Sequence, residues 1–324
     1  MSRWILRRLL QGVITLAVVM VLLFLLMRLT PGDPLGGIAG DRLMSPEEMQ
    51  LLRARYGLDQ PILQQFMTFA RGAVQGDFGT SIHRYPDRVG PLIRDRLPAS
   101  ILLGGTVLLL NFTIGIGLGV LQAVHRGSRF DRWLTRISLA AWALPSFWLG
   151  LVLIAVFSLT LGLFPAGQMQ DPLLPADAGP LTRLVDLLHH LALPALTLSA
   201  VSLAAGMRFQ RTAMLEVLRL DFVRAARARG LPERRVIWVH AWRNALSPVV
   251  TLLGLWLPML VAGSIYVESI FNWPGLGSLA AEAISGRDYP LLLGTAMLTS
   301  VLVVAGGVIA DLGYLLVDPR VRDS

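Results

Sequence analysis

Apolar residues along this chain gather in six long runs that contain no Asp, Glu, Lys or Arg. A helix needs roughly 17 to 25 residues to cross the hydrocarbon core of a bilayer, whereas helices of soluble domains average about 11 or 12 residues. Each run is long enough for one crossing, so the pattern predicts six membrane-spanning helices. The runs cover residues 9–27, 97–124, 137–170, 187–207, 244–267 and 289–310.

Two of these runs differ from a simple crossing in length or position. The run at 137–170 is too long for one helix, and we expect a loop to begin near Gly162, because Gly and Pro interrupt the apolar pattern in "GLFPAGQ". The first run exceeds the 7 to 15 apolar residues typical of a cleaved signal peptide, so it is predicted to be a retained helix. Composition agrees with a membrane protein, since 54% of residues are hydrophobic and 15% are charged, against about 25% charged residues in soluble domains.

Arginines fall mainly on one side of the predicted crossings. Six crossings place both chain ends on the same side, and cytoplasmic segments of membrane proteins carry an excess of basic residues. With the termini inside, the inner segments hold 18 arginines against six acidic residues, and the outer segments hold 11 arginines against 14 acidic residues. We therefore expect cytoplasmic termini, and we attribute the net charge of +8 to topology and not to nucleic-acid binding.

The outer segment between the first two runs, residues 28–96, predicts a small helical cap. In "SPEEMQLLRARYGL", Ser45 can cap a helix that starts at Pro46, and Gly57 can end it. Helices are expected over residues 46–56 and 62–74. The chain is thereby divided into residues 1–98, the first span with the cap, and residues 99–324, a five-helix core.

An arginine-rich inner loop, residues 207–243, separates the fourth run from the fifth. Each Arg at the centre of a membrane helix costs about 2.5 to 3.5 kcal/mol, so this loop must project into the cytoplasm. Alanines among the arginines favour a short helix, and Gly230 with Pro232 favours its end. One reading of the loop is a solvated segment that touches anionic lipid head groups.

The other reading of the loop is a contact for a partner protein. By the i, i+3, i+4 rule, Phe222, Ala225, Ala226 and Arg229 share one helix face, and a face of small residues suits a groove on another protein. Arg224 and Arg227 are then expected to be free to meet acidic or phosphate groups. Spacing alone leaves both readings open.

Sequence motifs favour the second reading. The pattern Arg224-Ala225-Ala226-x-x-x-Gly230 resembles the Glu-Ala-Ala-x-x-x-Gly signature of binding-protein-dependent ABC transporter permeases, with Arg in place of Glu. Further matches are "ILRRL" and "TPGDP" around the first run, "HAWRNALSPVV" after the loop, "ESIFNWPGLG" after the fifth run, "DPRVR" near the end, and "RYGLDQP" with "GDFGTS" in the cap. They cover nearly the whole chain in the family's order. The chain resembles the first permease subunit of dipeptide, oligopeptide and nickel importers.

The resemblance implies an all-α integral membrane protein with the type I ABC importer permease fold, located in the bacterial inner membrane among membrane lipid. It implies a non-catalytic subunit whose partners are a second homologous permease, two cytoplasmic ATPase subunits or domains and a periplasmic substrate-binding protein. ATP and Mg²⁺ would be bound by the ATPases, because a chain without lysine has no Gly-x-x-x-x-Gly-Lys-Ser/Thr phosphate loop. The residues expected to contact an ATPase are Asp221, Phe222, Arg224, Ala225, Ala226, Arg227, Arg229 and Gly230.

Polar positions inside the predicted spans are candidates for the translocation pathway. Such residues more often form a hydrogen bond between membrane helices than contact a substrate. Pro145 and Pro194 are expected to kink their helices. The pathway candidates are Asn111, Ser146, Ser199, Ser202 and Glu268.

Di- and oligopeptides are the expected substrates, with nickel, metal chelates and glutathione as alternatives that members of the resembled family also carry. An ion-coupled secondary transporter is a further alternative, and it would place ionisable residues at mid-membrane. Here His189 and His190 lie at the outer start of the fourth run, and Asp311 lies near the inner end of the last one. The adjacent histidines point in different directions on a helix, which also argues against an intramembrane metal site or enzyme.

Overall fold

The structure is a computed structural model that describes residues 2–29, 45–246, 256 and 265–317. These residues form helices and their connections, with an isolated antiparallel bridge between Thr80 and Arg88. Contacts divide the chain into two compact units. Unit 1 comprises Met1–Ser100 and Pro274–Ala305, and unit 2 comprises Ile101–Trp273 and Gly306–Ser324. The proposed boundary between residues 98 and 99 stays a prediction.

Four helices in the described part of the chain are long and apolar enough to cross a membrane. They match the first, second, fourth and sixth predicted runs. The predicted span at 244–267 lies largely outside the described residues, so the count of six stays a prediction. The first of the four is Leu6–Leu29 within α1 (Ser2–Leu29), the third is α9 (Pro180–Val217), and the fourth is Tyr289–Ile309 within α16 (Tyr289–Val317). The second, Val89–Val124, is formed by three consecutive elements, which are α5 (Val89–Leu110), the π-helical η1 (Asn111–Gly115) and α6 (Ile116–Val124).

The third predicted run contains a bent pair of helices, and the crossing expected there stays a prediction. Arg129–Ala143 (α7) and Ser146–Thr160 (α8, Ser146–Leu153, continued by η2, Ile154–Thr160) meet at 105°. The break lies at Pro145, because proline has no backbone N–H and pushes the preceding residue out of the helical region. Leu144 accordingly has an extended backbone, with ψ of 132°. The loop expected near Gly162 is confirmed, since the helix ends before this residue, whose φ is +61°.

In unit 1, both predicted cap helices are present. The first is α3 (Pro46–Arg55), and Ser45 caps it in the expected way. The Ser45 hydroxyl accepts a hydrogen bond from the Glu48 N–H at 3.2 Å, and the Glu48 carboxylate accepts one from the Ser45 N–H at 2.8 Å. Both free N–H groups are thereby satisfied. The second helix is α4 (Ile62–Gln75), which ends at Gly76 in a left-handed conformation.

A buried carboxylate ties the cap to the segment that precedes α16. Asp288 is completely buried between α15 (Leu276–Ser285) and α16, and it accepts hydrogen bonds from the Ser81 hydroxyl, the His83 N–H and the Leu291 N–H. Beside it, Arg84 donates two hydrogen bonds to Glu282 of α15, at 2.6 and 2.7 Å. Helix α15 was not predicted, because its ten residues are too few to register as a span. These contacts join the two chain segments of unit 1.

In unit 2, α9 is the helix against which α6, α7 and α8 pack. It runs for 38 residues and continues through Pro194 without a break, so it is much longer than the predicted run at 187–207. Its last turns are polar on one side and bury Gln210, Ala213 and Met214 on the other. Packing on this side explains why the helix continues beyond the apolar run.

Because α6 lies very close to α9, we expect one added methyl group at this contact to lower the stability of the protein strongly. A Cβ atom on Gly119 would lie 2.7 Å from the Met207 carbonyl oxygen and 2.8 Å from the Gln210 Cβ atom, whereas a Cβ atom on Gly117 of the same helix would meet open space. We expect Gly119→Ala to destabilise the protein by about 1–3 kcal/mol through overpacking and Gly117→Ala to have little effect. Thermal unfolding in detergent measures both. Equal melting temperatures for the two variants would contradict this packing.

Candidate functional site

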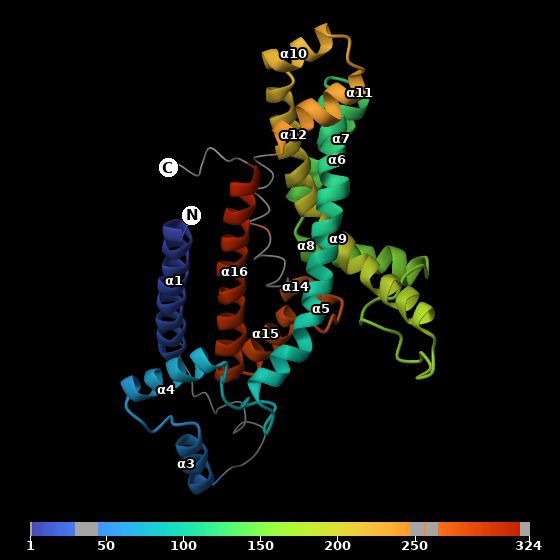
Figure 1. The fold of residues 1–324 in the computed structure, drawn as a ribbon. Helices are drawn as coiled ribbons and strands as arrows, with labels where there is room; N and C mark the ends of the chain where they lie inside the picture. Colours follow the sequence, from blue (N-terminus) through green and yellow to red (C-terminus); the bar gives the residue numbers. More distant parts are fainter. Residues whose placement is uncertain (1, 30–44, 247–255, 257–264, 318–324) are drawn as a thin grey trace. The chain divides into compact units, whose positions relative to one another are not determined.

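The helix predicted inside the arginine-rich loop is α10 (Asp221–Ala228), which follows α9 after a short turn. Figure 1 shows it at the tip of unit 2, beyond the ends of α6 and α7. The helix ends in the expected way at Gly230, whose φ is +75°. The Gly230 N–H bonds the Arg227 carbonyl at 2.9 Å and the Leu231 N–H bonds the Ala226 carbonyl at 3.4 Å, the paired arrangement of a Schellman motif. Gly230 therefore fixes both the length and the exit of α10.

A hydrophobic cluster holds α10 against the helices behind it. Val223 and Ala226 are 0% and 1% exposed. They pack with side chains from α6, from the end of α9, from the π-helical η3 (Val236–Ala241) and from α12 (Trp242–Ala245). The remaining helix of the loop, α11 (Glu233–Arg235), leads directly into η3. Because these elements share one core, α10 is a fixed extension of the helix bundle.

This packing corrects the predicted contact face. Phe222, Ala225 and Arg229 are exposed, but Ala226 belongs to the buried side with Val223. The physical reason is that α10 has apolar residues on two sides, and residue 226 lies at their boundary, three positions after Val223. The surface that α10 can present to a partner therefore includes Ala225 but not the side chain of Ala226.

The arginines of α10 also interact with neighbouring groups of the loop, which was not predicted. Arg227 donates hydrogen bonds to both carboxylate oxygens of Glu233, the shortest at 2.7 Å, and this pairing holds the pKa of Glu233 below its ordinary value. Arg224 lies 3.4 Å from the Asp221 carboxylate and donates to the Arg219 carbonyl at 3.2 Å. The expectation that both guanidinium groups are free was wrong. They stabilise the loop, and each keeps an exposed edge.

An ion pair that the sequence reading missed lies below α10. Asp131 of α7 is 4% exposed, and Arg211 of α9 donates a hydrogen bond to each of its carboxylate oxygens, both at 2.9 Å. The Gly127 N–H donates to the same carboxylate at 2.9 Å, and Gln122 donates to the Asp131 carbonyl. The turn between α6 and α7 is thus tied to α9 between one and two turns before the end of α9. A signal was present, because Asp131 is the only acid among four arginines and stands three residues after the helix cap Ser128.

Three of the five pathway candidates come together where η1 meets α9. The Asn111 amide donates to the Ser202 hydroxyl at 2.7 Å, and Ser202 donates to the carbonyls of Leu198 and Ser199. The Asn111 side-chain oxygen and the Ser199 hydroxyl are buried and have no hydrogen-bond partner in the described part of the chain. The group is a bond between two apolar helices, as membrane helices commonly form. Its role in a pathway stays a prediction.

The other two candidates lie elsewhere in unit 2. Ser146 is partly exposed at the first position of α8, directly after the break at Pro145. Glu268 is completely buried in α14 (Ile265–Ile270), and its carbonyl accepts a hydrogen bond from Trp273 at 2.8 Å. Neither contacts the Asn111 group through a hydrogen bond that the described residues contain.

The adjacent histidines have separate local partners. His190 is 7% exposed, and its Nδ1 atom lies 3.2 Å from the Asp186 carboxylate one turn earlier on α9. The His189 Nε2 atom lies 2.7 Å from the Leu163 carbonyl, in the loop that follows η2. The two rings are nearly perpendicular. They therefore secure this end of α9 and do not converge on a common site.

Fold and site together define a membrane-embedded helical protein that presents one short, rigidly packed helix at the end of its bundle. Comparison with known families agrees with this class. Residues 115–323 match the family described as binding-protein-dependent transport system inner membrane component, and residues 1–103 match the N-terminal family of the same membrane components. The chain belongs to this family of ABC importer permeases.

Curated relatives match along the full chain. It is 40% identical over 322 residues to the oligopeptide transport system permease protein AppB of Bacillus subtilis, with 99% of this chain and 100% of that protein covered. It is 38% identical over 338 residues to the dipeptide transport system permease protein DppB of Escherichia coli K12, and 39% identical over 337 residues to the di/tripeptide transport system permease protein DppB of Pseudomonas aeruginosa, with 99% of each chain covered in both cases.

A solved structure of the MetNI methionine ABC transporter in an inward-facing conformation shares the fold. The TM-score is 0.56 at 19% identity, and the match covers 70% of this chain and 96% of the other. The all-α type I importer permease fold predicted from the sequence is confirmed. The protein is a non-catalytic, membrane-embedded permease subunit of an ABC importer.

Proposed function

We propose that this chain forms half of the translocation pathway of an ATP-driven importer for di- and oligopeptides, and that α10 docks on a cytoplasmic ATPase. The observation that carries the proposal is the way in which α10 is packed. One side is fixed in the hydrophobic cluster through Val223 and Ala226, while Phe222 and Ala225 are left exposed at the tip of unit 2. A rigid helix with an exposed small residue can approach a partner closely and pass on its movement.

The proposed partners follow from this assignment. A second homologous permease would complete the pathway, two ATPase subunits would bind ATP and Mg²⁺, and a substrate-binding protein would deliver the peptide from the opposite side. The charge distribution supports an orientation with both termini and α10 in the cytoplasm, because the arginine excess lies on that side. The peptide substrate is supported by the relatives named as peptide permeases.

ATP binding would be coupled to transport through a shift of the complex between two conformational states. ATP favours one arrangement of the ATPase pair, and α10 must transmit that free-energy difference to the membrane helices. The hydrophobic cluster and the pair of Asp131 with Arg211 join α10, α6, α7 and α9. A displacement of α10 would therefore move these helices together, which is the mechanical requirement for alternating access.

Reconstitution distinguishes this function from an ion-coupled transporter. The complex containing this chain is placed in vesicles with its binding protein, and accumulation of a labelled dipeptide is measured with ATP supplied on the α10 side. We expect accumulation to require ATP and to persist when a protonophore collapses the proton gradient. Accumulation driven by the proton gradient without ATP would refute the proposal, and accumulation of nickel but not of the dipeptide would refute the substrate.

A further inference from the structure

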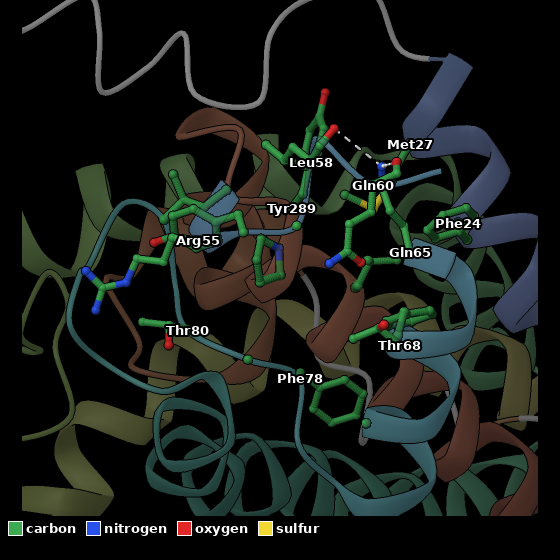
Figure 2. A pocket seen from close by; sticks show the side chains of 18 of the residues that line it. Phe24, Met27, Arg55, Leu58, Gln60, Gln65, Thr68, Phe78, Thr80 and Tyr289 are labelled. Atoms are coloured by element: carbon green, nitrogen blue, oxygen red, sulfur yellow. Dashed lines mark hydrogen bonds between the residues drawn. The ribbon is translucent and has the colours of Figure 1, made fainter. Parts of the chain in front are cut away.

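Unit 1 contains a cavity that the transport function does not explain. Its volume is about 470 Å³, and it lies between the C-terminal end of α1, the cap and the first turn of α16. The two cap motifs "RYGLDQP" and "GDFGTS", which are distant in sequence, both line it. Figure 2 shows Arg55 toward one side and Phe24 and Met27 toward the other, with Gln65 and Thr68 along the wall.

The position of the cavity places it at a membrane surface. Phe24 and Met27 belong to the last turns of the apolar helix α1, and Tyr289 and Leu293 begin the apolar span of α16. Both helices qualify as membrane crossings, so the cavity lies where their apolar parts end. In a bilayer, acyl chains surround the apolar parts of both helices. An amphiphile could therefore place its head group in the cavity and its chains in the adjoining bilayer.

Helix α4 supports the same placement independently. It crosses the end of α1 (Figure 1), and the Phe24 ring lies 5.4 Å from the Phe66 ring and 6.2 Å from the Phe69 ring, measured between centroids. On the other side of α4, Leu63, Met67 and Val74 are 72%, 50% and 83% exposed. Their spacing of four and seven residues puts them on one face. A helix with such an exposed apolar stripe next to a membrane span is typical of one that lies in the bilayer interface.

Two cationic side chains, Arg28 and Arg55, line the cavity. Among the other polar lining groups, the Tyr56 hydroxyl bonds the Ser81 carbonyl, and the Gln65 amide bonds the Gln60 carbonyl. Arg28 and Arg55 are exposed and contact aromatic rings, and neither has an ion-pair partner within the described residues.

The acidic side chain that lines the cavity, Asp77, has two partners within the cap. Asp77 accepts a hydrogen bond from the Gly79 N–H at 3.0 Å, and its carboxylate lies 4.0 Å from the Arg88 guanidinium. A zwitterionic peptide needs an available carboxylate for its ammonium group, whereas a phosphate needs only guanidinium donors. The chemistry of the cavity therefore favours an anion with an apolar tail over a peptide.

We propose that this cavity binds the head group of an anionic phospholipid, which the lining arginines Arg28 and Arg55 attract, with its acyl chains in the adjoining bilayer, while α4 lies in the head-group region of the same leaflet. In the orientation proposed above this is the outer leaflet. The site anchors the cap to the membrane surface beside the ends of two spans. It does not depend on ATP or on α10.

Lipid retention by the purified complex tests the head-group site. The complex is equilibrated with phosphatidylglycerol and phosphatidylcholine in equal amounts, and the retained lipids are counted by native mass spectrometry. We expect a preference for phosphatidylglycerol that falls about fivefold for each of Arg28→Gln and Arg55→Gln. Arg94→Gln, which removes an exposed arginine of unit 1 that does not line the cavity, serves as the matched control. An equal loss in all three variants would contradict a specific site.

Competition separates the possible ligands. Inorganic phosphate and a labelled dipeptide are each added to the complex with bound phosphatidylglycerol. We expect neither to displace the lipid at millimolar concentration, because neither supplies acyl chains. Arginine-dependent binding of phosphate or of the dipeptide, without a preference for phosphatidylglycerol, would overturn the proposal in favour of that ligand.

Fluorescence quenching tests the placement of α4 without changing the cavity. The chain has no cysteine, so Met67→Cys introduces its one thiol for a fluorophore, and Leu51→Cys on α3 provides an exposed control. In nanodiscs that contain nitroxide-labelled lipid, we expect strong quenching at position 67 and weak quenching at position 51. Equal quenching at both positions, or protection of position 67 by the binding protein instead of by lipid, would contradict the proposal.

Discussion

Replacing Ala225 with Trp is expected to abolish ATP-driven uptake while the protein still folds and inserts. Ala225 is exposed on the outer side of α10, so a large side chain there disturbs no core. A central contact that is lost in this way costs about 2 kcal/mol or more in association, which predicts a decrease in uptake of roughly 30-fold or more. Uptake of a labelled dipeptide by cells or vesicles measures the effect, and the amount of protein in the membrane fraction measures insertion.

Two companion substitutions make this result specific. Ala226→Trp replaces a side chain that is 1% exposed, so it should reduce folded protein as well as uptake. Gly230→Asp puts a charged residue at a φ of +75° and should also abolish uptake with insertion intact, whereas Gly230→Asn, which tolerates this conformation better, should retain part of the activity. Normal uptake by Ala225→Trp would remove α10 from the mechanism.

Removing the charge of Asp131 is expected to have the second large effect. Asp131→Asn keeps the shape of the side chain but leaves Arg211, whose side chain is 27% exposed, without its counterion. Breaking a buried pair in this way costs about 3–5 kcal/mol, and the lower end applies here because Arg211 keeps some contact with water. We expect a lower melting temperature and a ratio of transported peptide to hydrolysed ATP at least several times smaller. The ratio is the informative readout, since mere loss of folded protein leaves it unchanged.

A double variant checks that the two residues act as a pair. Asp131→Asn combined with Arg211→Gln removes both charges and leaves two side chains that can still bond each other. The double variant should therefore be more stable, and better coupled, than additive effects of the single variants predict. Strictly additive losses would show that Asp131 and Arg211 act separately, and an unchanged coupling ratio in Asp131→Asn would remove the pair from the transmission path.

Local sequence patterns predicted many of the helices correctly because local physics determines them. The cap of Ser45, the end of the loop helix at Gly230 and the break at Pro145 each follow from the backbone chemistry of one residue and its neighbours. The membrane spans follow from the absence of charge over a sufficient length. In these places the surrounding fold adds little to what the local sequence already specifies.

Contacts between distant segments were harder to predict. Ala226 was assigned to the partner face because the rule of helical spacing does not say which of two apolar sides is buried, and only the cluster with α6, α9 and η3 decides this. Arg211 and Asp131 are 80 residues apart, and Ser81 and Asp288, which also bond each other, are 207 residues apart. The continuation of α9 through polar residues depends on the same long-range packing.

The central claim is that Ala225 of α10 touches a cytoplasmic ATPase. Because the chain contains no cysteine, Ala225→Cys and Ala226→Cys each provide a single thiol in this chain for a short cross-linker in the assembled complex. The account predicts cross-linking of position 225 to an ATPase subunit, a yield that changes when ATP is added, and little or no cross-linking from the buried position 226. A thiol at position 225 that reacts only with reagents on the opposite side of the membrane, or that never reaches an ATPase subunit, would contradict it.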